Sequence, residues 1–430
     1  MLSKRYKNEL IIDPQSLFYR RQTCRLCDSL KLEKILSFPS CPPVDNYRYA
    51  NEPEIFLPDL PMDLYMCSEC GHAQLLDVVK PEILFGNYIY TSNSSPDLQE
   101  HFEGYVEALK SRINLKHGDF VIDIGSNDGL LLKKLQANGC EVQGVDPAES
   151  VATKAIENGI PTIVSFLDET VVEKILAESG PADFVTANNV FSHSDDLRNF
   201  AHMIRRLLKP EGVFIFEVSY LKDLVENKVL DYVYHEHLAH HSVLPLKRFF
   251  ESIGMRLFDV EHVNVKGGSI RGFVSLIGAS WQDSGNVELF IQNELDMGLY
   301  SSDVYLKLAD DVSQLKRQIN AQLRGEIERG HVIASYGASA TSTVLLRLLG
   351  IEKYVSFIID DNVDRQGRLS PGDLIPVYPR SFLLDKKPSV TFIAAWRFAD
   401  LIIPRNAEYL ANGGKFIVPL PSINIVSAHD

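Results

Sequence analysis

The sequence lacks any uninterrupted apolar run near the roughly 20 residues that a membrane-spanning helix needs. Its opening stretch, MLSKRYKNELIIDPQ, mixes charges throughout and has no apolar core of the kind found in a secretory signal. These two absences favour a protein without a membrane partner, and we expect a cytoplasmic location.

An excess of positive charge is also missing. The chain has 43 Lys and Arg against 57 Asp and Glu, a net charge of −14. Nucleic-acid binders usually carry a basic face, because neutralisation of phosphates supplies most of their non-specific affinity. We therefore expect no nucleic-acid partner, although a local basic patch is compatible with an acidic whole. A few Arg side chains and backbone N–H groups suffice to bind an anionic small molecule.

Cysteine is scarce, yet four of the six cysteines form two CxxC pairs, Cys24/Cys27 and Cys67/Cys70. In a cytosolic chain this pattern favours a metal over disulfides, and four thiolates from two turns suit a tetrahedral zinc ion. Because no coordination position is left open, the zinc would be structural. Unpaired buried cysteines, or a redox CxxC, are the alternatives. Cys41 is interpreted as a packing residue.

A Gly-rich loop occurs in VIDIGSNDGLLL. It matches neither of the two common phosphate-binding patterns, GxGxxG and GxxxxGK[ST]. There a buried strand ends at Asp123 and is followed by Gly125, Asn127 and Asp128, and the next strand ends at Asp146. Ligands of parallel sheets bind at the carboxyl ends of strands, where an acidic side chain can accept hydrogen bonds from ribose hydroxyls. The acidic loop suits a ligand with a cationic end. An ordinary strand-to-helix turn is the alternative.

A chain of 430 residues is too long for one hydrophobic core. Residues 1–85 are loop-rich, so they need a metal staple. From about residue 120, strands alternate with helices, which predicts a parallel doubly wound sheet in an α/β domain over 86–285. Two strands at 255–263 and 269–277 would close that sheet. One or two helices in 289–330 would then link it to a second α/β domain, so that the third unit covers 286–430.

Four of the twelve histidines lie in YVYHEHLAHH. Tyr234, Glu236 and His237 form an acid/base group suited to removing a proton beside a carbonyl. In an extended segment Glu236 would point away from His237, whereas in a turn the three side chains can converge. A metal site, a helix cap and a polar interface are the alternatives for this cluster.

The Gly-rich loop resembles the first motif of class I methyltransferases, which bind S-adenosylmethionine. The resemblance implies that Asp123, Gly125, Asn127, Asp128 and Asp146 hold this cofactor. TANNVFSH (186–193) is similar to the family's edge between cofactor and substrate, which would bring Asn188 near the methionine portion.

Taken together, the motifs resemble the nucleotide-sugar C-methyltransferases that build branched-chain deoxysugars. The resemblance runs nearly end to end and includes both CxxC pairs, YIYTSNSSPDLQEHF, VIDIGSNDG, ANNVFSHSDDL, YHEHLAHHS, KGGSIRGFV and YGASATSTVLL. It implies a class I, Rossmann-like core between a small zinc module and a C-terminal Rossmann-like α/β domain. It also implies methylation of C-3 of a nucleotide-linked 4-keto-6-deoxyhexose through an enolate, with S-adenosylmethionine as the donor.

In that family the base is the last histidine of YHEH, which is His237 here, with Tyr234 and Glu236 as companions. His193 corresponds to a histidine at the sugar, and Tyr88 to an aromatic hydroxyl that closes the site. Without the resemblance, packing explains Tyr88 equally well, and a polar helix start explains His193.

Further residues would bind the sugar nucleotide. In KGGSIR, Lys266 or Arg271 could supply a cation to the diphosphate beside Gly268, with surface solvation as the alternative for Lys266. By analogy, the loop from Tyr336 to Ser339 would offer backbone N–H groups to phosphate. Two departures stand out: Thr341 replaces a lysine that family members often have, and Trp396-Arg397-Phe398 replaces Trp-His-Phe.

Two other functions compete. A methyltransferase of another acceptor, on oxygen, nitrogen or RNA, would share the cofactor loop, and a zinc-bearing binding protein without activity would share the module. The negative charge disfavours RNA, and an intact YHEH beside an intact cofactor loop disfavours a vestigial site. The nucleotide, the sugar stereochemistry and the oligomeric state are not determined by the sequence, and a monomer is compatible with it.

Overall fold

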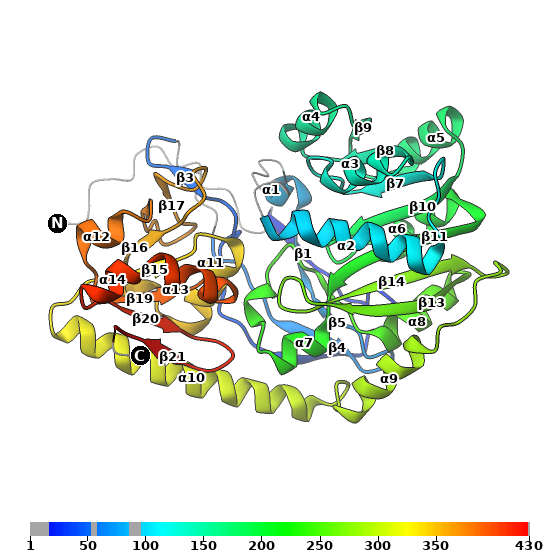
Figure 1. Cartoon of the computed structure of the whole chain (residues 1–430). Helices are drawn as coiled ribbons and strands as arrows, with labels where there is room; N and C mark the ends of the chain where they lie inside the picture. The colour runs from blue at the N-terminus through cyan, green and yellow to red at the C-terminus, as the bar shows by residue number, and fades with distance from the viewer. Residues whose placement is uncertain (1–16, 53–57, 86–95, 429–430) are drawn as a thin grey trace.

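The computed structural model describes residues 17–52, 58–85 and 96–428. Three units follow one another along the chain (Figure 1). The central domain forms one lobe and the C-terminal domain the other. The N-terminal module pairs strands with both of them, and one long helix, α10 (Ser302–Glu328), runs along the base of the molecule.

The central domain is built on a seven-stranded sheet of order β13-β14-β11-β10-β7-β8-β9. Its parallel strands bury β-branched and aromatic side chains, as expected where helices cover both faces. β13 and β14 pair antiparallel at the edge and close this same sheet, which confirms the sequence prediction. The strands are β7 (Phe120–Ile124), β8 (Glu141–Asp146), β9 (Thr162–Val164), β10 (Ala182–Asn188), β11 (Leu208–Ser219), β13 (Met255–Val263) and β14 (Ser269–Leu276).

Alternating side chains of β7 enter two different cores, because successive residues of a strand face opposite sides. Val121 packs under α2 and α3, whereas Ile122 and Ile124 pack under α5, α6 and α8. The sheet is thus doubly wound, as predicted. The helices are α2 (Pro96–Ile113), α3 (Leu130–Ala137), α4 (Glu149–Glu157), α5 (Glu169–Glu178), α6 (Leu197–Leu207), α7 (Leu221–Glu226) and α8 (Val243–Ser252).

The N-terminal module is less separate than a boundary at residue 85 implies. Its four-stranded antiparallel sheet has the order β12-β5-β4-β2, and β12 (Ala239–His240) comes from the central domain. A second strand pair joins β3 to β17 (Arg368–Leu369) of the C-terminal domain. The module's elements are β1 (Phe18–Arg20), β2 (Leu32–Leu36), β3 (Arg48–Tyr49), β4 (Leu64–Cys67), β5 (Ala73–Leu75), β6 (Asp77–Val79) and α1 (Pro81–Phe85).

The C-terminal domain is the second α/β unit that the sequence predicts. Its sheet has the order β18-β16-β15-β19-β20-β21, and all pairs are parallel except the last. Helices α10 and α11 cover one face, and α12, α13 and α14 the other. The elements are β15 (Ile333–Tyr336), α11 (Ala340–Leu349), β16 (Val355–Ile359), β18 (Val377–Tyr378), α12 (Phe382–Lys386), β19 (Val390–Ile393), α13 (Ala399–Arg405), α14 (Ala407–Ala411), β20 (Lys415–Val418) and β21 (Asn424–Val426).

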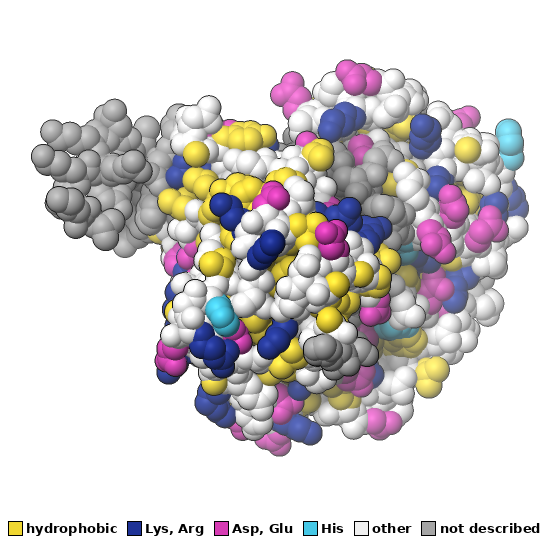
Figure 2. All heavy atoms as spheres, turned by 60° about the vertical axis from the view of Figure 1, so that its left-hand side comes forward, with side chains coloured by type: hydrophobic (Ala, Val, Ile, Leu, Met, Phe, Trp, Pro, Cys, Tyr) yellow, Lys and Arg dark blue, Asp and Glu magenta, His cyan; other side chains and the backbone are white. Residues whose placement is uncertain are grey.

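Two helices link the lobes, α9 (Asn286–Asp296) and α10. Helix α10 contacts β2, α7, α11 and β15, so it touches all three units. Within the described ranges, no helix combines the length and the apolarity needed to cross a bilayer. On the face that carries the C-terminal domain, basic and acidic side chains are interspersed among the described residues (Figure 2).

Candidate active site

The four cysteines of the two CxxC pairs form one cluster. Their sulfur atoms all lie within 4.8 Å of one another, and the Cys24–Cys70 and Cys27–Cys67 Sγ distances are both 3.6 Å. Tetrahedral zinc with Zn–S bonds of about 2.3 Å separates its sulfur ligands by about 3.8 Å, so the cluster fits this ion. Cys41 lies outside the cluster and is buried, as the packing interpretation requires.

The turn after β7 is shaped by close packing rather than by flexibility. Gly125 has φ 72°, and a Cβ at this position would lie 2.2 Å from Cγ2 of Val190. Any larger residue would push apart the two loops that follow β7 and β10. Glycine therefore allows these two strand ends to approach each other.

Two buried carboxylates end β7 and β8. Asp146 accepts hydrogen bonds from the backbone N–H groups of Asn127 and Ala148, at 2.8 and 2.9 Å, which fixes its orientation. Asp123 accepts from the Thr186 hydroxyl at 2.6 Å. Burial, with a smaller contribution from the nearby Asp146, raises the pKa of Asp123 to about 7. A cation placed beside Asp123 would restore its ionised form.

The YHEH segment is a turn. The N–H of His237 donates to the carbonyl of Tyr234 at 2.8 Å, and β12 starts two residues later. The turn brings Tyr234, Glu236 and His237 to the wall of the same cavity. Of the two geometries that the sequence allows, the structure has the converging one.

His237 is held as a single tautomer. Its Nδ1 lies 2.7 Å from the carbonyl oxygen of Tyr232, and since a carbonyl can only accept, the proton sits on Nδ1 and the lone pair on Nε2. Burial lowers the pKa of His237 to about 4, so the imidazole is neutral near pH 7. The rings of Tyr234 and His193 contact it with centroid distances of 4.0 and 5.2 Å.

The pKa values of Glu236 and Lys266 are shifted in opposite directions, and both shifts favour the neutral form. Burial, followed by the charge of Asp45, raises the pKa of Glu236 to about 8, so this side chain is a neutral carboxylic acid at pH 7. Burial lowers the pKa of Lys266 to about 8. Lys266 is half-buried by surface area and lines the cavity.

One cavity of about 410 Å³ connects the cofactor loop and the YHEH turn. This volume lies within the usual range for small-molecule sites. Its wall includes residues at the carboxyl ends of β7, β8 and β10 and residues of the YHEH turn. The predicted site residues that line it are Asp123, Gly125, Asn127, Asp146, Asn188, His193, Tyr234, Glu236, His237 and Lys266.

Five predicted site residues in the described part of the chain lie outside the lining of this cavity, and three of them belong to the central domain. Asp128 is buried, and its backbone N–H donates to the Asn127 side chain. Gly268 has φ 119°, and a Cβ there would lie 2.3 Å from Asp223, so its packing requires glycine. Arg271 is 4% exposed, and the prediction of a diphosphate contact gains no support from its position.

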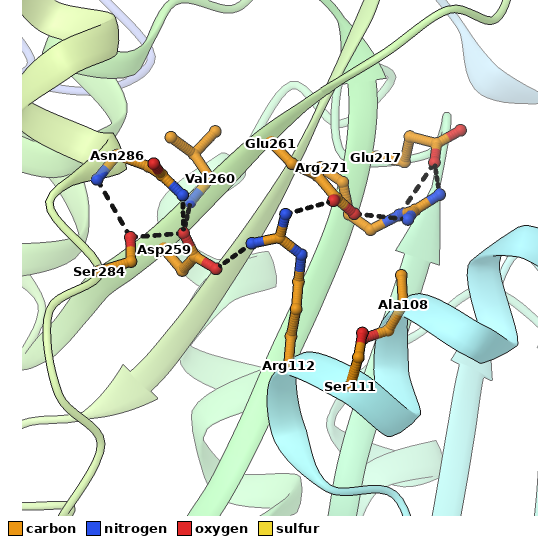
Figure 3. Close-up of polar contacts among 10 residues, drawn as sticks. All are labelled: Ala108, Ser111, Arg112, Glu217, Asp259, Val260, Glu261, Arg271, Ser284 and Asn286. Carbon is orange, nitrogen blue, oxygen red and sulfur yellow. Dashed lines mark hydrogen bonds and ion pairs between the residues drawn. The ribbon is translucent and has the colours of Figure 1, made fainter.

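Arg271 belongs to a buried ion-pair network on the outer strands (Figure 3). It contacts Glu217 at 2.8 Å and Glu261 at 2.6 Å, while Arg112 of α2 reaches Glu261 and Asp259. Its guanidinium also lies 4.0 Å from the ring centroid of Tyr105. Buried charges need partners, and these carboxylates already supply them. The network joins β11, β13, β14 and α2.

The loop after β15 does not reach the cavity either. The N–H groups of Gly337 and Ala338 already donate to the Ile359 carbonyl and the Asp360 carboxylate, so neither is free for a phosphate. The Ser339 hydroxyl caps α11, and the Tyr336 hydroxyl donates to Asp361. Tyr88 lies outside the described residues.

Glu217 and His101 are among the lining residues that sequence reasoning missed. Their side chains meet at 2.8 Å, between Nε2 of His101 and Oε1 of Glu217. Burial by itself would raise the pKa of Glu217, but the contact with His101 and the charge of Arg271 hold it below its usual value. The available signal was the place of Glu217 near the end of the apolar run GVFIFEV, which is typical of a buried strand.

Three family models match successive parts of the chain. Residues 24–85 match one described as "Putative zinc binding domain", residues 98–260 match a methyltransferase domain, and residues 264–421 match a C-methyltransferase C-terminal domain. The C-terminal family model begins at residue 264, before the predicted domain boundary at 286. Its first part lies inside the central domain, since β14 belongs to the seven-stranded sheet.

Among curated relatives, C-methyltransferase NovU of Streptomyces niveus is 32% identical over 406 residues, covering 94% of this chain and 97% of NovU. A ubiquinone biosynthesis O-methyltransferase of Salmonella paratyphi A is 30% identical over 103 residues, 23% of this chain and 42% of that protein. The solved PH0226 protein of Pyrococcus horikoshii is 19% identical, with a TM-score of 0.36, and the match covers 44% of this chain and 94% of PH0226.

The end-to-end match to NovU, together with the three family models in the same order, is what decides the family. The four-cysteine cluster agrees with the zinc-binding description, and the cofactor loop lies inside the matched methyltransferase domain. The chain is a methyltransferase of the S-adenosylmethionine-dependent C-methyltransferase family, with an N-terminal zinc module.

Proposed function

We propose that the enzyme methylates C-3 of a nucleotide-linked 4-keto-6-deoxyhexose. The single observation that supports this most is the shared cavity, whose wall holds a neutral imidazole and a neutral carboxylic acid together with the cofactor loop. S-adenosylmethionine supplies an electrophilic methyl group when it is bound. Transfer to carbon needs an acidic C–H bond and a base, whereas transfer to an alcohol needs no carbon acid.

Each group of the YHEH turn then has a chemical role. Nε2 of His237 takes the proton from C-3, which is acidic because of the adjacent ketone, and the C–H electron pair forms an enolate. Glu236, kept neutral by burial, donates a hydrogen bond to the enolate oxygen. Lys266 and His193 lie in the same wall, and Lys266 offers a cation to that developing charge.

The cofactor end of the cavity is assigned by charge. Asp146 keeps lone pairs free for ribose hydroxyls beside the two N–H groups it already accepts from. Asp123 would face the ammonium group of the methionine portion. Asn127 and Asn188 line the same cavity, and Gly125 allows the loops after β7 and β10 to approach each other there.

Exchange in D₂O tests this function. The enzyme is incubated in D₂O with a nucleotide-linked 4-keto-6-deoxyhexose, and C-3 is followed by NMR. We expect deuterium at C-3 without a methyl donor, and a C-3 methyl group once S-adenosylmethionine is added. Methylation of oxygen without exchange at carbon would refute the proposal, as would the absence of both.

The affinity for S-adenosylmethionine should depend on pH through Asp123. A carboxyl group with its pKa raised to about 7 is protonated below that pH in the free enzyme, and a cationic ligand favours the ionised form. The affinity for S-adenosylmethionine should therefore increase as the pH rises to about 7 and then level off. Below pH 7 the increase should be up to about tenfold per pH unit.

Titration calorimetry between pH 5.5 and 8.5, values chosen to span about one and a half units on either side of this pKa, measures the effect. Asp123→Asn should bind more weakly and lose the dependence. Adenosine, which has no ammonium group, serves as the matched ligand and should bind with little change over this range. An affinity of the unmodified enzyme for S-adenosylmethionine that does not vary with pH would contradict the assignment.

A further inference from the structure

A buried ion pair joins the C-terminal domain to the loop that carries the base. Asp231 has no exposed surface, and Nη1 of Arg397 lies 3.1 and 3.0 Å from its two carboxylate oxygens. Trp396 donates its indole N–H to the same carboxylate at 3.1 Å. A buried carboxylate depends on such partners, since removal of one leaves an uncompensated charge.

The residue next to Asp231 is the one that orients His237. Both belong to the 3₁₀ turn Leu230–Tyr232, and the carbonyl of Tyr232 accepts the Nδ1 proton of His237 at 2.7 Å. The Tyr232 ring stacks on the His237 ring, with centroids 5.5 Å apart and an interplanar angle of 22°. The position of this turn therefore decides which nitrogen of His237 carries the proton and where the other one points.

Arg397 contacts this turn twice. Besides its ion pair, its guanidinium carbon lies 4.8 Å from the ring centroid of Tyr232. A planar cation above an aromatic face is favourable and restricts the ring. Helix α11 of the C-terminal domain packs against the same turn. The turn is thus held from the C-terminal side by charge, by stacking and by packing.

The aliphatic part of Arg397 reaches the second wall of the cavity. Gly267 has φ 90°, and a Cβ there would lie 3.5 Å from Cδ of Arg397. Its neighbour Lys266 lines the cavity. One side chain from the C-terminal domain therefore contacts the loops that carry His237 and Lys266.

We propose that Arg397 is a positioning residue, through which the docked C-terminal domain fixes the tautomer and orientation of His237. This proposal rests on the proposed function only where it makes His237 the base. The sequence departs from Trp-His-Phe at this position, and the contacts of the arginine explain why it suits the site, because it combines a permanent charge with a planar stacking surface. The C-terminal domain then acts on the base itself.

The test compares Arg397→Ala and Arg397→Lys with a matched control, Arg347→Ala. Arg347 also lies in the C-terminal domain and bridges to the N-terminal module, pairing with Asp59 and Asp373 at 2.9 Å. Both of these carboxylates lie outside the 230–237 loop, so the loss of Arg347 removes an interdomain ion pair in which neither Asp231 nor Tyr232 takes part. All variants are made in the full-length enzyme.

The first measurement needs no substrate. Nitrogen-15 NMR of the imidazole groups, with the His237 signals assigned from a His237→Gln sample, reports which ring nitrogen carries the proton. We expect the Nδ1–H form alone in the unmodified enzyme and in Arg347→Ala, and a mixture of both tautomers in Arg397→Ala. An unchanged His237 tautomer in a folded Arg397→Ala protein would overturn the proposal, whatever its activity.

The second measurement is the rate of deuterium exchange and of methylation at C-3. Misplacing a reacting group by about 1 Å costs about 100-fold, so we expect a fall of kcat by about that factor in Arg397→Ala with the Kd of S-adenosylmethionine within about twofold of its original value. Arg397→Lys keeps the charge without the planar surface, so its kcat should lie between those of the unmodified enzyme and Arg397→Ala. If the alanine variant does not fold, the lysine variant is used for the test. An equal loss in Arg347→Ala would overturn the proposal.

The two measurements separate the two hypotheses. If the unmodified enzyme shows no exchange with the keto sugar, the proposed function fails, while a tautomer change in Arg397→Ala still supports the positioning role. If exchange occurs but Arg397→Ala keeps both its rate and the single tautomer, the positioning role fails and the proposed function stands.

Discussion

His237→Ala is expected to abolish both deuterium exchange and methyl transfer at the acidic sugar carbon. A positioned general base contributes typically 10²–10⁴-fold. We therefore expect kcat to fall by about 10³-fold. The Kd of S-adenosylmethionine should change little, since the carboxylates of β7 and β8 remain.

The control is His202→Ala, which removes an exposed histidine of α6. It should leave exchange, methylation and cofactor affinity as they are. Exchange at C-3 is measured by NMR in D₂O, methylation by mass spectrometry and affinity by calorimetry. Retention of turnover by His237→Ala would remove this histidine as the base and leave the keto-sugar chemistry without its central group.

Loss of zinc should be equally damaging, although the cysteines lie far from His237 in sequence. Structural zinc in small domains supplies roughly 10–16 kcal/mol of apparent folding free energy. Arg25, between the first two cysteines and 2% exposed, pairs with Asp195 of the cavity wall at 2.9 Å. Strand β5 of the module pairs with β12, directly after the YHEH turn. Cys67→Ser should therefore lower methylation by about 100-fold or more.

Metal analysis, thermal melting and methylation assays check this prediction. The unmodified enzyme should hold one zinc ion per four-cysteine cluster, and Cys67→Ser should lose the ion and melt at a lower temperature. The matched control is Cys140→Ser, a buried cysteine outside the cluster, which should keep the metal and its activity. A Cys67→Ser protein that lacks zinc yet melts and turns over like the original would exclude the structural role.

Much of the fold was predictable because its signals are local. The strands over 120–124, 141–146 and 182–188 are buried β-branched runs, and each is followed by a turn and a helix. The edge pair β13 and β14 was also expected. The strand pairs that tie residues 73–75 to 239–240, and 48–49 to 368–369, could not be predicted, because such two- and three-residue strands carry no periodicity of their own.

The site residues likewise fall into those that local sequence signals predict and those that depend on tertiary structure. Asp123, Gly125 and Asp146 follow from strand ends, and the convergence of Tyr234, Glu236 and His237 was one of the two geometries that the sequence allows. Arg271 illustrates the limit. Its ion pairs with the buried Glu217 and the partly buried Glu261 depend on strand register across the sheet, which the sequence does not display. A conspicuous arginine beside two glycines was therefore assigned to a ligand, whereas the structure places it against these carboxylates.

The continuous helix α10 has a consequence for how this enzyme can vary. It holds 27 residues, so it spans about 40 Å, and each residue added within it would rotate everything beyond by about 100°. Arg397 and Trp396 would then turn away from Asp231. Among relatives, changes of length in this interdomain connection should thus be confined to the segments around Gly298 and Gly330, just outside the two ends of the helix. Chimaeras between relatives should exchange the helix whole, because its phase sets where the last domain docks.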